Sequence, residues 1–450
     1  MSNSEIVVQS TDTFEVEVDF CEDGSVRRLS IVEPKEMETS TFEKSLVDEL
    51  LWLSIEWQRT CLGFFEAAPA MSFATQALND ATVSNLALKH VQGCNVGVAD
   101  SKDGSKVFEV PSRERLMLSR IIDEANRFRQ ISTVHRNALL LALIAEYENH
   151  FRKLVTILFR SNPLQFVGND TEVKTLDVFK ATDLKQLQET IFAAKVDKFL
   201  SGSHYDKLKS LGASVDKNFL SDAKLTAEFV EICERRNLFA HNGGVVNAGY
   251  IDKCEAVGFK WKEKPSVGDQ LSIDEHYLQR AFARVFMFGF FPLHMIIQKN
   301  HPSKIEDSID CCNSCTHDFL LAGLTKMARR VAVFGLTSAK SKGNQKQKIY
   351  LTINKALSHF LDDSLEKKDQ REKVAKELSS LDWSVTDSTT KLALNCISEN
   401  YEEIDSLVRN ALSEGIGYTE FSTWAVFEKA RKVECFRDAV SKHLGLKFMA

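Results

Sequence analysis

The sequence predicts a mostly α-helical protein, and three observations lead to this fold class. Apolar residues recur at three- and four-residue spacing along most of the 450 residues. The chain has only 7 prolines, which leaves long helices uninterrupted. The longest clear pattern runs over residues 136–160 and ends before Asn162-Pro163. A chain of this length exceeds one compact core, so we expect roughly two or three domains.

A small α+β region is expected over residues 1–110. Residues 14–20 alternate apolar and acidic side chains, Asp23-Gly24 offers a tight turn, and residues 26–32 resume the strand pattern. Together these segments predict a β-hairpin. The elements expected after the hairpin are two helices and a short strand, over 42–62, 73–91 and 107–110.

Residues 111–302 are expected to form an antiparallel helical bundle. Its helical patterns, besides the long one, cover 184–200, 205–211, 223–240 and 276–297. The connections between them are longer than in the last third of the chain.

Composition and the first residues point to a cytoplasmic protein that makes no membrane contact. The start, MSNSEIVVQSTD, has neither a basic stretch nor an apolar core, so no export signal is expected there. The most apolar segment, 281–297, contains Arg284 and Pro292, and it indicates a pair of buried, Phe-rich helices rather than a bilayer span. The net charge of −6 excludes nucleic-acid binding by bulk charge, so any such contact must be a local site.

One segment carries a chemical signature. Residues 229–251, FVEICERRNLFAHNGGVVNAGYI, describe the end of an amphipathic helix closed by two glycines. Arg235, Arg236, Asn237 and His241 fall within its last two turns. This group suits phosphate chemistry, because arginine binds two phosphoryl oxygens at once and histidine titrates near neutral pH.

The pattern Arg-Asn-x-x-x-His fits RNA cleavage without a metal. That reaction needs a proton acceptor for the 2′-hydroxyl, a proton donor for the leaving 5′-oxygen and positive charge near the phosphorane. His241 can supply the first two, Arg236 the third, and Asn237 can hold the imidazole or the phosphate in register. Five residues along a helix place Arg236 and His241 about 140° apart. One helix therefore does not aim both side chains at one atom, unless His241 lies in a frayed helix end.

The spacing alone is not specific, since 129–135 and 437–443 also join an arginine to a histidine. The asparagine after Arg236, the arginine before it and the His-Asn-Gly-Gly helix exit set this segment apart. With these residues it resembles the HEPN superfamily of helical ribonucleases and nucleotide-binding domains. A second match lies on the long helix, where HEPN ribonucleases carry a glutamate, three residues and a basic residue. Here these are Glu148 and Arg152, which share one helix face and can pair with each other or with Arg236.

The resemblance implies a metal-independent endoribonuclease that needs no cofactor. It implies a helical bundle that forms a homodimer, in which Arg236 of one copy and His241 of the other flank one RNA phosphate. The part of the chain from the Glu148 helix to residue 251 is similar to the large HEPN proteins linked to bacterial toxins and phage defence. The roles that the resemblance implies are catalysis for Arg236 and His241, orientation for Asn237, and support for Glu148, Arg152 and Arg235.

Other interpretations stay open. A HEPN-like bundle can be catalytically inactive and bind nucleotide or RNA together with a protein partner. Arg236 and His241 can also serve only to stabilise a helix C-terminus through its dipole. Cys312, Cys315 and His317 form half of a zinc site, but four-coordinate zinc needs a second ligand pair, so no metal is expected.

Residues 303–450 are expected to form further helix pairs joined by short turns. The helical patterns cover 318–333, 349–360, 371–378, 389–398, 403–412 and 421–432. Small residues at packing positions and aromatic residues near the turns resemble degenerate tetratricopeptide-like repeats. Such an array implies a surface for a protein partner, which we expect to restrain or trigger the nuclease.

Overall fold

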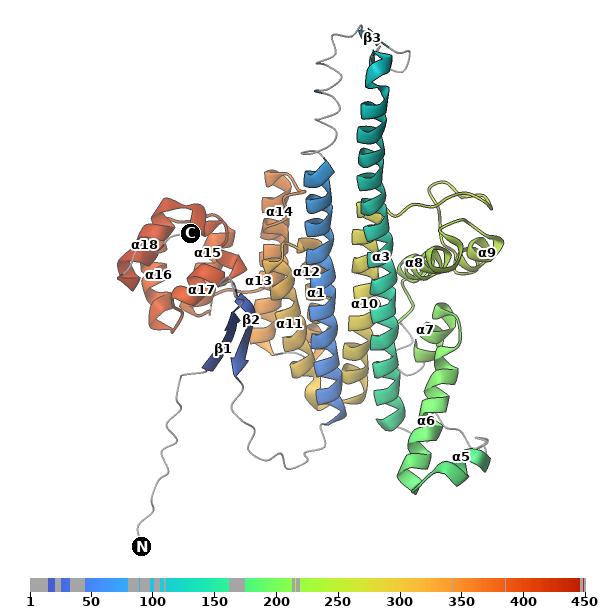
Figure 1. The fold of residues 1–450 in the computed structure, drawn as a ribbon. Helices are drawn as coiled ribbons and strands as arrows, with labels where there is room; N and C mark the ends of the chain where they lie inside the picture. The colour runs from blue at the N-terminus through green and yellow to red at the C-terminus, as the bar shows by residue number, and fades with distance from the viewer. Residues whose placement is uncertain are drawn as a thin grey trace. The chain divides into compact units, whose positions relative to one another are not determined.

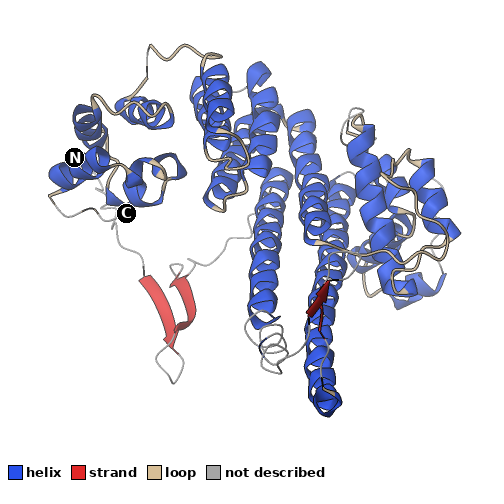
Figure 2. Cartoon of the chain, turned by 90° about the horizontal axis from the view of Figure 1, so that it is seen from above, coloured by secondary structure: helices blue, strands red, loops and turns tan. Residues whose placement is uncertain are grey.

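The computed structural model describes residues 15–20, 26–32, 45–79, 89, 98–100, 106–108, 111–161, 175–212, 215, 219–342, 344–384, 386–445 and 448. Helices make up most of this part of the chain (Figure 1, Figure 2). The prediction of a mostly α protein is therefore confirmed. The chain divides into two compact units, Met1–Ser45 and Leu46–Ala450.

The first unit contains the predicted hairpin. Strand β1 (Glu15–Phe20) pairs antiparallel with β2 (Val26–Val32), with a register shift between Asp19 and Phe20. The predicted turn at Asp23-Gly24 lies outside the described residues. In the second unit, β3 (Val98–Asp100) pairs with β4 (Lys106–Phe108), which overlaps the short strand expected before Pro111.

Three long helices form the centre of the second unit. They are α1 (Leu46–Asn79), α3 (Arg115–Ser161) and α10 (Glu275–Asn300), and they run side by side (Figure 1). Their buried faces share one hydrophobic core in which aromatic rings pack edge to face. A continuous core of this size supplies most of the stability of the bundle.

The three helices approach most closely around Gly289. The indole Nε1 of Trp57 on α1 donates a hydrogen bond to the Phe286 carbonyl of α10 at 3.0 Å. A Cβ atom on Gly289 would lie 2.2 Å from that nitrogen, so only glycine fits there. His150 of α3 stacks on Trp57 at 4.6 Å and bonds the Gly289 carbonyl at 2.9 Å. Burial lowers the pKa of His150 to about 4, so this histidine is a neutral core residue at pH 7.

A smaller group of helices packs against α3 through α6 (Leu184–Leu200) and α8 (Ala223–Asn242). It also contains α5 (Thr175–Lys180), α7 (His204–Gly212) and α9 (Ala248–Ala256). Side chains satisfy the first backbone N–H groups of α6, α8, α9 and α10, and the capping residues are Asp183, Asp222, Asn247 and Asp274. These caps fix where each helix begins.

The remaining helices form successive pairs. They are α11 (Ile305–Leu321), α12 (Thr325–Lys342), α13 (Gln345–Phe360), α14 (Lys367–Leu378), α15 (Ser388–Ile397), α16 (Ile404–Ser413), α17 (Tyr418–Thr423) and α18 (Glu434–Leu444). Neighbours in the chain pack together at α11–α12, α12–α13, α13–α14 and α15–α16. Short 3-10 turns lie at Ser112–Glu114, Pro302–Lys304, Ala425–Phe427 and Ala430–Lys432.

The compact units do not follow the boundaries expected at 110 and 302. Helix α1 lies before the first boundary, yet it packs against α3 and α10, which lie after it. Helix α11 lies after the second boundary, and its buried Cys312, Cys315 and Phe319 belong to the same core as α1 and α10. Truncation near residue 303 would therefore expose this core.

Several predicted helices differ in length from the observed ones. The patterns over 42–62 and 73–91 join in α1, which passes through Pro69, although residues 80–88, 90 and 91 lie outside the described part. The apolar segment 281–297 is one helix rather than a pair, since α10 continues through Pro292. Proline normally interrupts a helix, because it removes a backbone hydrogen bond. At Pro69 and Pro292 the helices continue, since tertiary packing outweighs the loss of that bond.

Two C-terminal segments that were each predicted to form one continuous helix are interrupted in the structure. The pattern over 318–333 is broken between α11 and α12, where Gly323 adopts a left-handed φ of 71° that ends a helix. Residues 421–432 form part of α17 and two 3-10 turns rather than one helix. Helices α5, α9 and α18 were not predicted.

One helix could be mistaken for a membrane span. Among the described residues, α10 alone is long and apolar enough to cross a bilayer, and 72% of its apolar window is buried in the protein. Packing in the core accounts for its composition.

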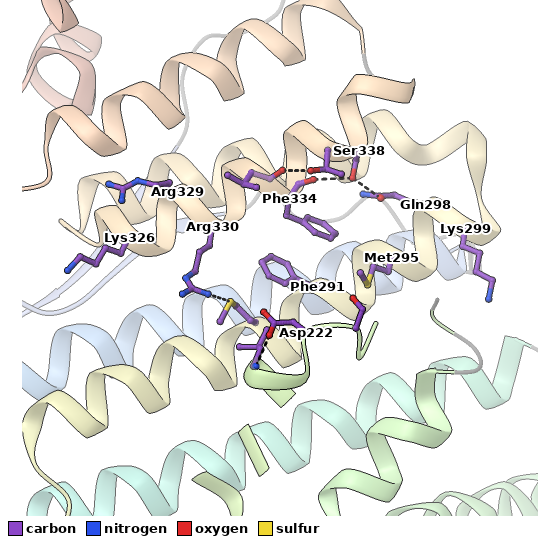
Figure 3. Close-up of a pocket in the computed structure, with 15 residues that line it drawn as sticks. Asp222, Phe291, Met295, Gln298, Lys299, Lys326, Arg329, Arg330, Phe334 and Ser338 are labelled. Atoms are coloured by element: carbon purple, nitrogen blue, oxygen red, sulfur yellow. Dashed lines mark hydrogen bonds between the residues drawn. The ribbon is translucent and has the colours of Figure 1, made fainter. Parts of the chain in front are cut away.

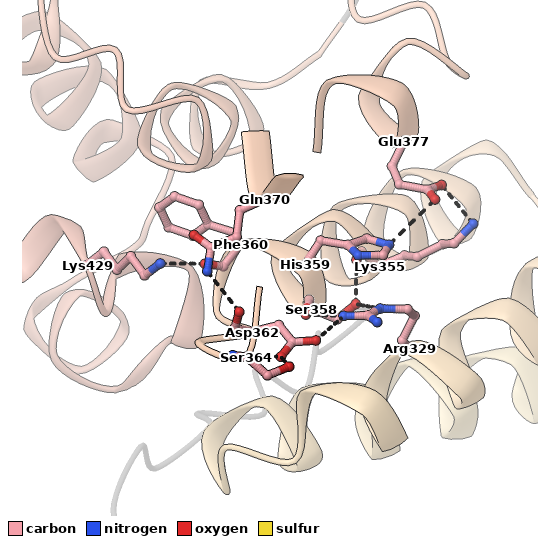
Figure 4. A network of polar contacts seen from close by, with 10 residues as sticks. All are labelled: Arg329, Lys355, Ser358, His359, Phe360, Asp362, Ser364, Gln370, Glu377 and Lys429. Atoms are coloured by element: carbon pink, nitrogen blue, oxygen red, sulfur yellow. Dashed lines mark hydrogen bonds and ion pairs between the residues drawn. The ribbon is translucent and has the colours of Figure 1, made fainter. Parts of the chain in front are cut away.

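A polar network joins α12, α13 and the segment that follows them (Figure 4). The carboxylate of Asp362, which is buried, accepts hydrogen bonds from Arg329 at 2.9 Å and from Ser364 at 2.6 Å. Burial alone would raise the pKa of Asp362, but these donors outweigh it and lower that pKa. Arg329 also donates to the Ser358 carbonyl at 2.8 Å. Arg329 is therefore a structural cation.

Replacing Gly289 by alanine should destabilise the bundle. The new methyl group would overlap Trp57, so we expect the free energy of unfolding to fall by about 3 kcal/mol. Gly63→Ala on α1 is the matched control, because nothing lies within 4 Å of the added atom and an exposed helical glycine should gain about 0.5–1 kcal/mol. Urea denaturation of the three proteins measures both changes. Equal stability of the Gly289→Ala protein and the wild type would show that the Trp57 contact is not tight.

Truncation of the two adjacent arginines on α12 should change stability by very different amounts. Arg329→Ala leaves the buried Asp362 carboxylate without its cation, so we expect a loss of about 3 kcal/mol. Arg330→Ala should change stability by less than about 0.5 kcal/mol, since no ion pair among the described residues involves it. Thermal denaturation at neutral pH separates the two, and a larger loss for the Arg330 variant would contradict this assignment.

Candidate functional site

Side chains from three helices contact one another at Glu148. Glu148 lies on α3, and its Oε1 accepts a hydrogen bond from the Arg236 guanidinium of α8. The same oxygen lies 3.1 Å from Nε2 of His204, the first residue of α7. Lys207, one turn further along α7, lies near enough for the charges of Glu148 and Arg236 to shift its pKa. We call Glu148, His204, Lys207 and Arg236 the Glu148 cluster.

Local sequence explains how α8 presents Arg236 to this cluster. Asp222 caps the helix start by accepting from the Leu225 N–H at 2.9 Å. Gly243 ends the helix with a left-handed φ of 58°. Between them, Phe229 packs against Tyr147 of α3 at 5.0 Å. This contact sets α8 against α3 at the height where Arg236 reaches Glu148.

Charge is unevenly distributed around Glu148. Burial alone would raise the pKa of this carboxyl, but the hydrogen bonds and positive charges of His204 and Arg236 outweigh burial and lower it. The pKa of Lys207 is lowered mainly by burial. The charge of Glu148 opposes this shift, and the charges of Arg236 and Arg152 add smaller lowering effects. Within the cluster, Arg236 and Lys207 are two permanent cations beside the single carboxylate of Glu148, and an excess of positive charge attracts anions.

One donor of Arg236 remains unsatisfied. Its Nε is buried and has no hydrogen-bond acceptor in the part of the chain that the structure describes. A buried donor without an acceptor is costly, so its presence suggests that the arginine serves more than stability.

Arg235 faces a different carboxylate from Arg236. Its Nε donates to Glu231 at 2.7 Å, and its guanidinium lies 4.1 Å from the centre of the Tyr277 ring. Glu231 is buried and also accepts from the hydroxyls of Tyr250 at 2.8 Å and Tyr277 at 2.9 Å. Burial raises the pKa values of both tyrosines, so they remain neutral donors. Arg235 therefore links α8 to α9 and α10, away from the Glu148 cluster.

Asn237 and His241 lie outside the cluster. Among the described residues, the Asn237 amide makes a single long contact of 3.5 Å with Glu234, which Lys253 binds more closely at 2.9 Å. His241 is exposed in the last turn of α8, and its side chain forms no hydrogen bond or ion pair with the described residues. Because α8 stays helical through Asn242, His241 is not in a frayed end, and it points away from Arg236.

Arg152 has a different partner from the expected one. It binds Asp197 of α6 at 2.6 Å, and its side chain is 53% exposed. An exposed ion pair of this kind contributes little to stability. Of the two pairings left open for Glu148, the structure contains the one with Arg236.

His204 was missed by the sequence analysis. It is 56 residues from Glu148 in the chain and belongs to no motif with it. It is also buried, and its ring packs 6.4 Å from that of Phe229. Only the position of α7 beside α8 brings it to the cluster, and no sequence spacing encodes that position.

The cysteines of α11 belong to the core. Cys312 and Cys315 are buried, and burial raises the pKa of both thiols. Within the described residues, no group of three or more His, Cys, Asp or Glu side chains is arranged to hold a metal ion. His317 lies near Asp318 on the same helix, at 3.7 Å.

Comparison with known proteins gives no relative for this chain. No protein-family model matches its sequence, and no match was found among curated proteins or solved structures. The resemblance to HEPN ribonucleases therefore rests on the motif residues alone, and the site must be judged by its own geometry.

Glu148→Gln should weaken the cluster in a pH-dependent way. The folded pKa of Glu148 is lowered, so its carboxylate stabilises the fold above its ordinary pKa of 4.5 and loses this effect as the pH falls below that value. At pH 7 we expect the variant to lose about 1 kcal/mol, a figure reduced for its partial exposure. The difference from wild type should shrink towards pH 4.

Asp197→Asn is the matched control for this measurement. It removes one carboxylate from the exposed pair with Arg152, so its effect should stay below about 0.5 kcal/mol. Thermal denaturation at both pH values compares the proteins. If the two variants lose equal stability at pH 7, Glu148 is no more than another surface charge.

Proposed function

We propose that this protein is a metal-independent endoribonuclease of the HEPN type, acting in the cytoplasm as a homodimer. The observation that carries the proposal is the placement of Arg236. Its guanidinium binds a carboxylate within a cluster rich in cations. A carboxylate and a phosphate present similar oxygen pairs to arginine, so Glu148 occupies the place of a phosphate oxygen.

An RNA phosphate would bind the Arg236 guanidinium by displacing Glu148 from it. Glu148 is only partly buried, with 40% of its side chain exposed, so a phosphate can approach from the same side. Lys207 and Arg236 would then face the negative charge that develops on the phosphorane. Glu148 and His204 act as positioning residues, since Glu148 holds the arginine in place until the phosphate displaces it, and His204 binds Glu148.

The imidazole of His241 is the proposed proton-transfer group. It removes the proton of the 2′-hydroxyl, the 2′-oxygen attacks phosphorus, and the bond from phosphorus to the 5′-oxygen breaks. The imidazolium returns a proton to that leaving oxygen, which gives a 2′,3′-cyclic phosphate and a 5′-hydroxyl. Asn237 lies between the two groups in the sequence and can orient the imidazole in the assembled site.

The direction of His241 supports a site shared by two copies. Within one chain, Arg236 turns towards α3 while His241 lies exposed on the last turn of α8. A two-fold arrangement lets the exposed His241 of one copy approach the Glu148 cluster of the other. A role as toxin or anti-phage effector is consistent with such an enzyme and remains part of the proposal.

A second candidate is a catalytically inactive module that binds RNA or nucleotide. It is favoured by the same pairing of Arg236 with Glu148, since the buried His204 is the one histidine that contacts this pair within the part of the chain that the structure describes. In this case RNA would bind to the cluster and remain intact.

Substitution of the motif residues tests the nuclease directly. Arg236→Ala and His241→Ala should each lower cleavage of total RNA by about 100-fold or more. Arg152→Ala, the matched control, should retain activity because its exposed pair lies outside the Glu148 cluster. Cleavage should persist in chelator. RNA that is bound but never cut would favour the inactive module, and cleavage by both substituted proteins would exclude this site.

Mixing the two inactive proteins tests the shared site. If Arg236 and His241 act across a dimer, a heterodimer of the two variants contains one intact site. After subunit exchange, the mixture should regain about one quarter of the wild-type activity. No recovery, with exchange verified by mass spectrometry, would show that both residues act within one chain.

A further inference from the structure

A groove separate from the Glu148 cluster lies between α10, α12 and the start of α8 (Figure 3). Its volume is about 1250 Å³. Apolar side chains of all three helices line it, namely Leu225, Met287, Phe291, Met295, Val333 and Phe334. None of these residues takes part in the proposed nuclease chemistry.

The floor of the groove is preformed yet adaptable. The rings of Phe291 and Phe334 stack across it at 4.5 Å with an interplanar angle of 16°, and Figure 3 shows them facing each other between the two helices. Met287 and Met295 lie one helical turn to either side of Phe291. Methionine side chains adjust to irregular apolar partners. Val333 beside them is 44% exposed, which is high for a large apolar residue.

Two cations border one end of the groove. Lys326 and Arg330 lie one turn apart on α12, and both are exposed. Arg330 approaches the sulfur of Met287 at 3.5 Å, but it enters no ion pair among the described residues. The arginines near it differ, since Arg329 binds Asp362 and Arg284 binds Glu228. Of these three arginines, Arg330 is therefore the one whose guanidinium is available to pair with an anion of a partner.

Acidic groups near this end are already engaged. Asp222 lines the groove, but its side chain caps α8. Glu228 binds Arg284. Lys326 and Arg330 therefore repel each other across one turn of α12, and like charges at this spacing destabilise a helix slightly. An acidic partner would remove this repulsion between Lys326 and Arg330.

The dimensions of the groove match a short helix. From Lys326 to Thr337 the wall formed by α12 extends about 16 Å, or three helical turns. The volume exceeds the range of about 300–1000 Å³ that is usual for small-molecule sites. No strand lines the groove, so the described walls offer side chains rather than a free strand edge for recognition. Helix-in-groove binding is the mode that uses such walls.

We propose that this groove binds an amphipathic helix of a protein partner. The partner would place apolar side chains at i, i+4 and i+7 on Phe291, Phe334 and Val333, and acidic side chains against Lys326 and Arg330. The proposal goes beyond the nuclease activity and does not depend on it, because binding is measured without RNA.

Selection from a displayed library of random 16-residue peptides against the full-length protein tests this proposal. Enriched peptides should carry the apolar spacing with Asp or Glu at one end. Val333→Asp, which places a charge on the apolar wall, and Arg330→Glu should each weaken their binding about tenfold or more. Both positions are exposed, so the variants should fold, and thermal denaturation verifies this. Lys367→Glu, on the exposed start of α14, is the charge-matched control and should bind like wild type.

Charge exchange gives the sharper result. Replacing the acidic residues of a selected peptide by lysine should abolish binding to wild type and restore it to the Arg330→Glu protein. The proposal is overturned if selection yields no binders, or if both groove variants bind the selected peptides as well as wild type does. It is also overturned if Val333→Asp converts a dimer to a monomer, since the groove would then be covered by a second copy.

Discussion

The arrangement of α3, α7 and α8 depends on one carboxylate. Glu148 is bound by Arg236 and by His204, so a single side chain of α3 fixes one side chain from each of the other two helices. Removing a carboxylate and a guanidinium from water is costly, and only complementary partners recover that cost. The lowered pKa of Glu148 indicates that its two partners outweigh the effect of burial. Within this part of the protein, the position of Arg236 is therefore set by electrostatics as well as by packing.

The core holds Glu148 at the right height for this interaction. Two residues along α3, His150 stacks on Trp57 and bonds the Gly289 carbonyl. Trp57 in turn lies where a Cβ atom of residue 289 would be. Because helices in a close-packed core cannot slide without losing such contacts, the junction of α1, α3 and α10 fixes the register of α3. A rigid support of this kind holds the backbone of α3 in place when the partner of Arg236 changes from Glu148 to a phosphate.

Much of this architecture could be predicted from the sequence, and the misses have physical causes. Apolar periodicity predicted α6 at its observed bounds, and the two glycines predicted the end of α8 to within two residues. The pairing of Glu148 with Arg236 was one of two alternatives that the resemblance to HEPN ribonucleases left open. The contact of Arg235 with Glu231 is an i,i+4 pair on α8 that the sequence analysis did not consider. The burial of Glu231 could not be foreseen, because the tyrosines that bind it come from other helices. The contact of His204 with Glu148 and the groove between α10 and α12 could not be predicted for the same reason, since both arise where helices distant in sequence pack together.

The central claim is that the Arg236 guanidinium, now bound by Glu148, is the place where an RNA phosphate binds. A crystal structure with a short oligoribonucleotide, made uncleavable by 2′-O-methyl groups, tests this most directly. The account predicts a phosphate oxygen within hydrogen-bond distance of Arg236, near the His241 imidazole of a second copy. An oligonucleotide bound elsewhere, with the pair of Arg236 and Glu148 unchanged, would contradict it.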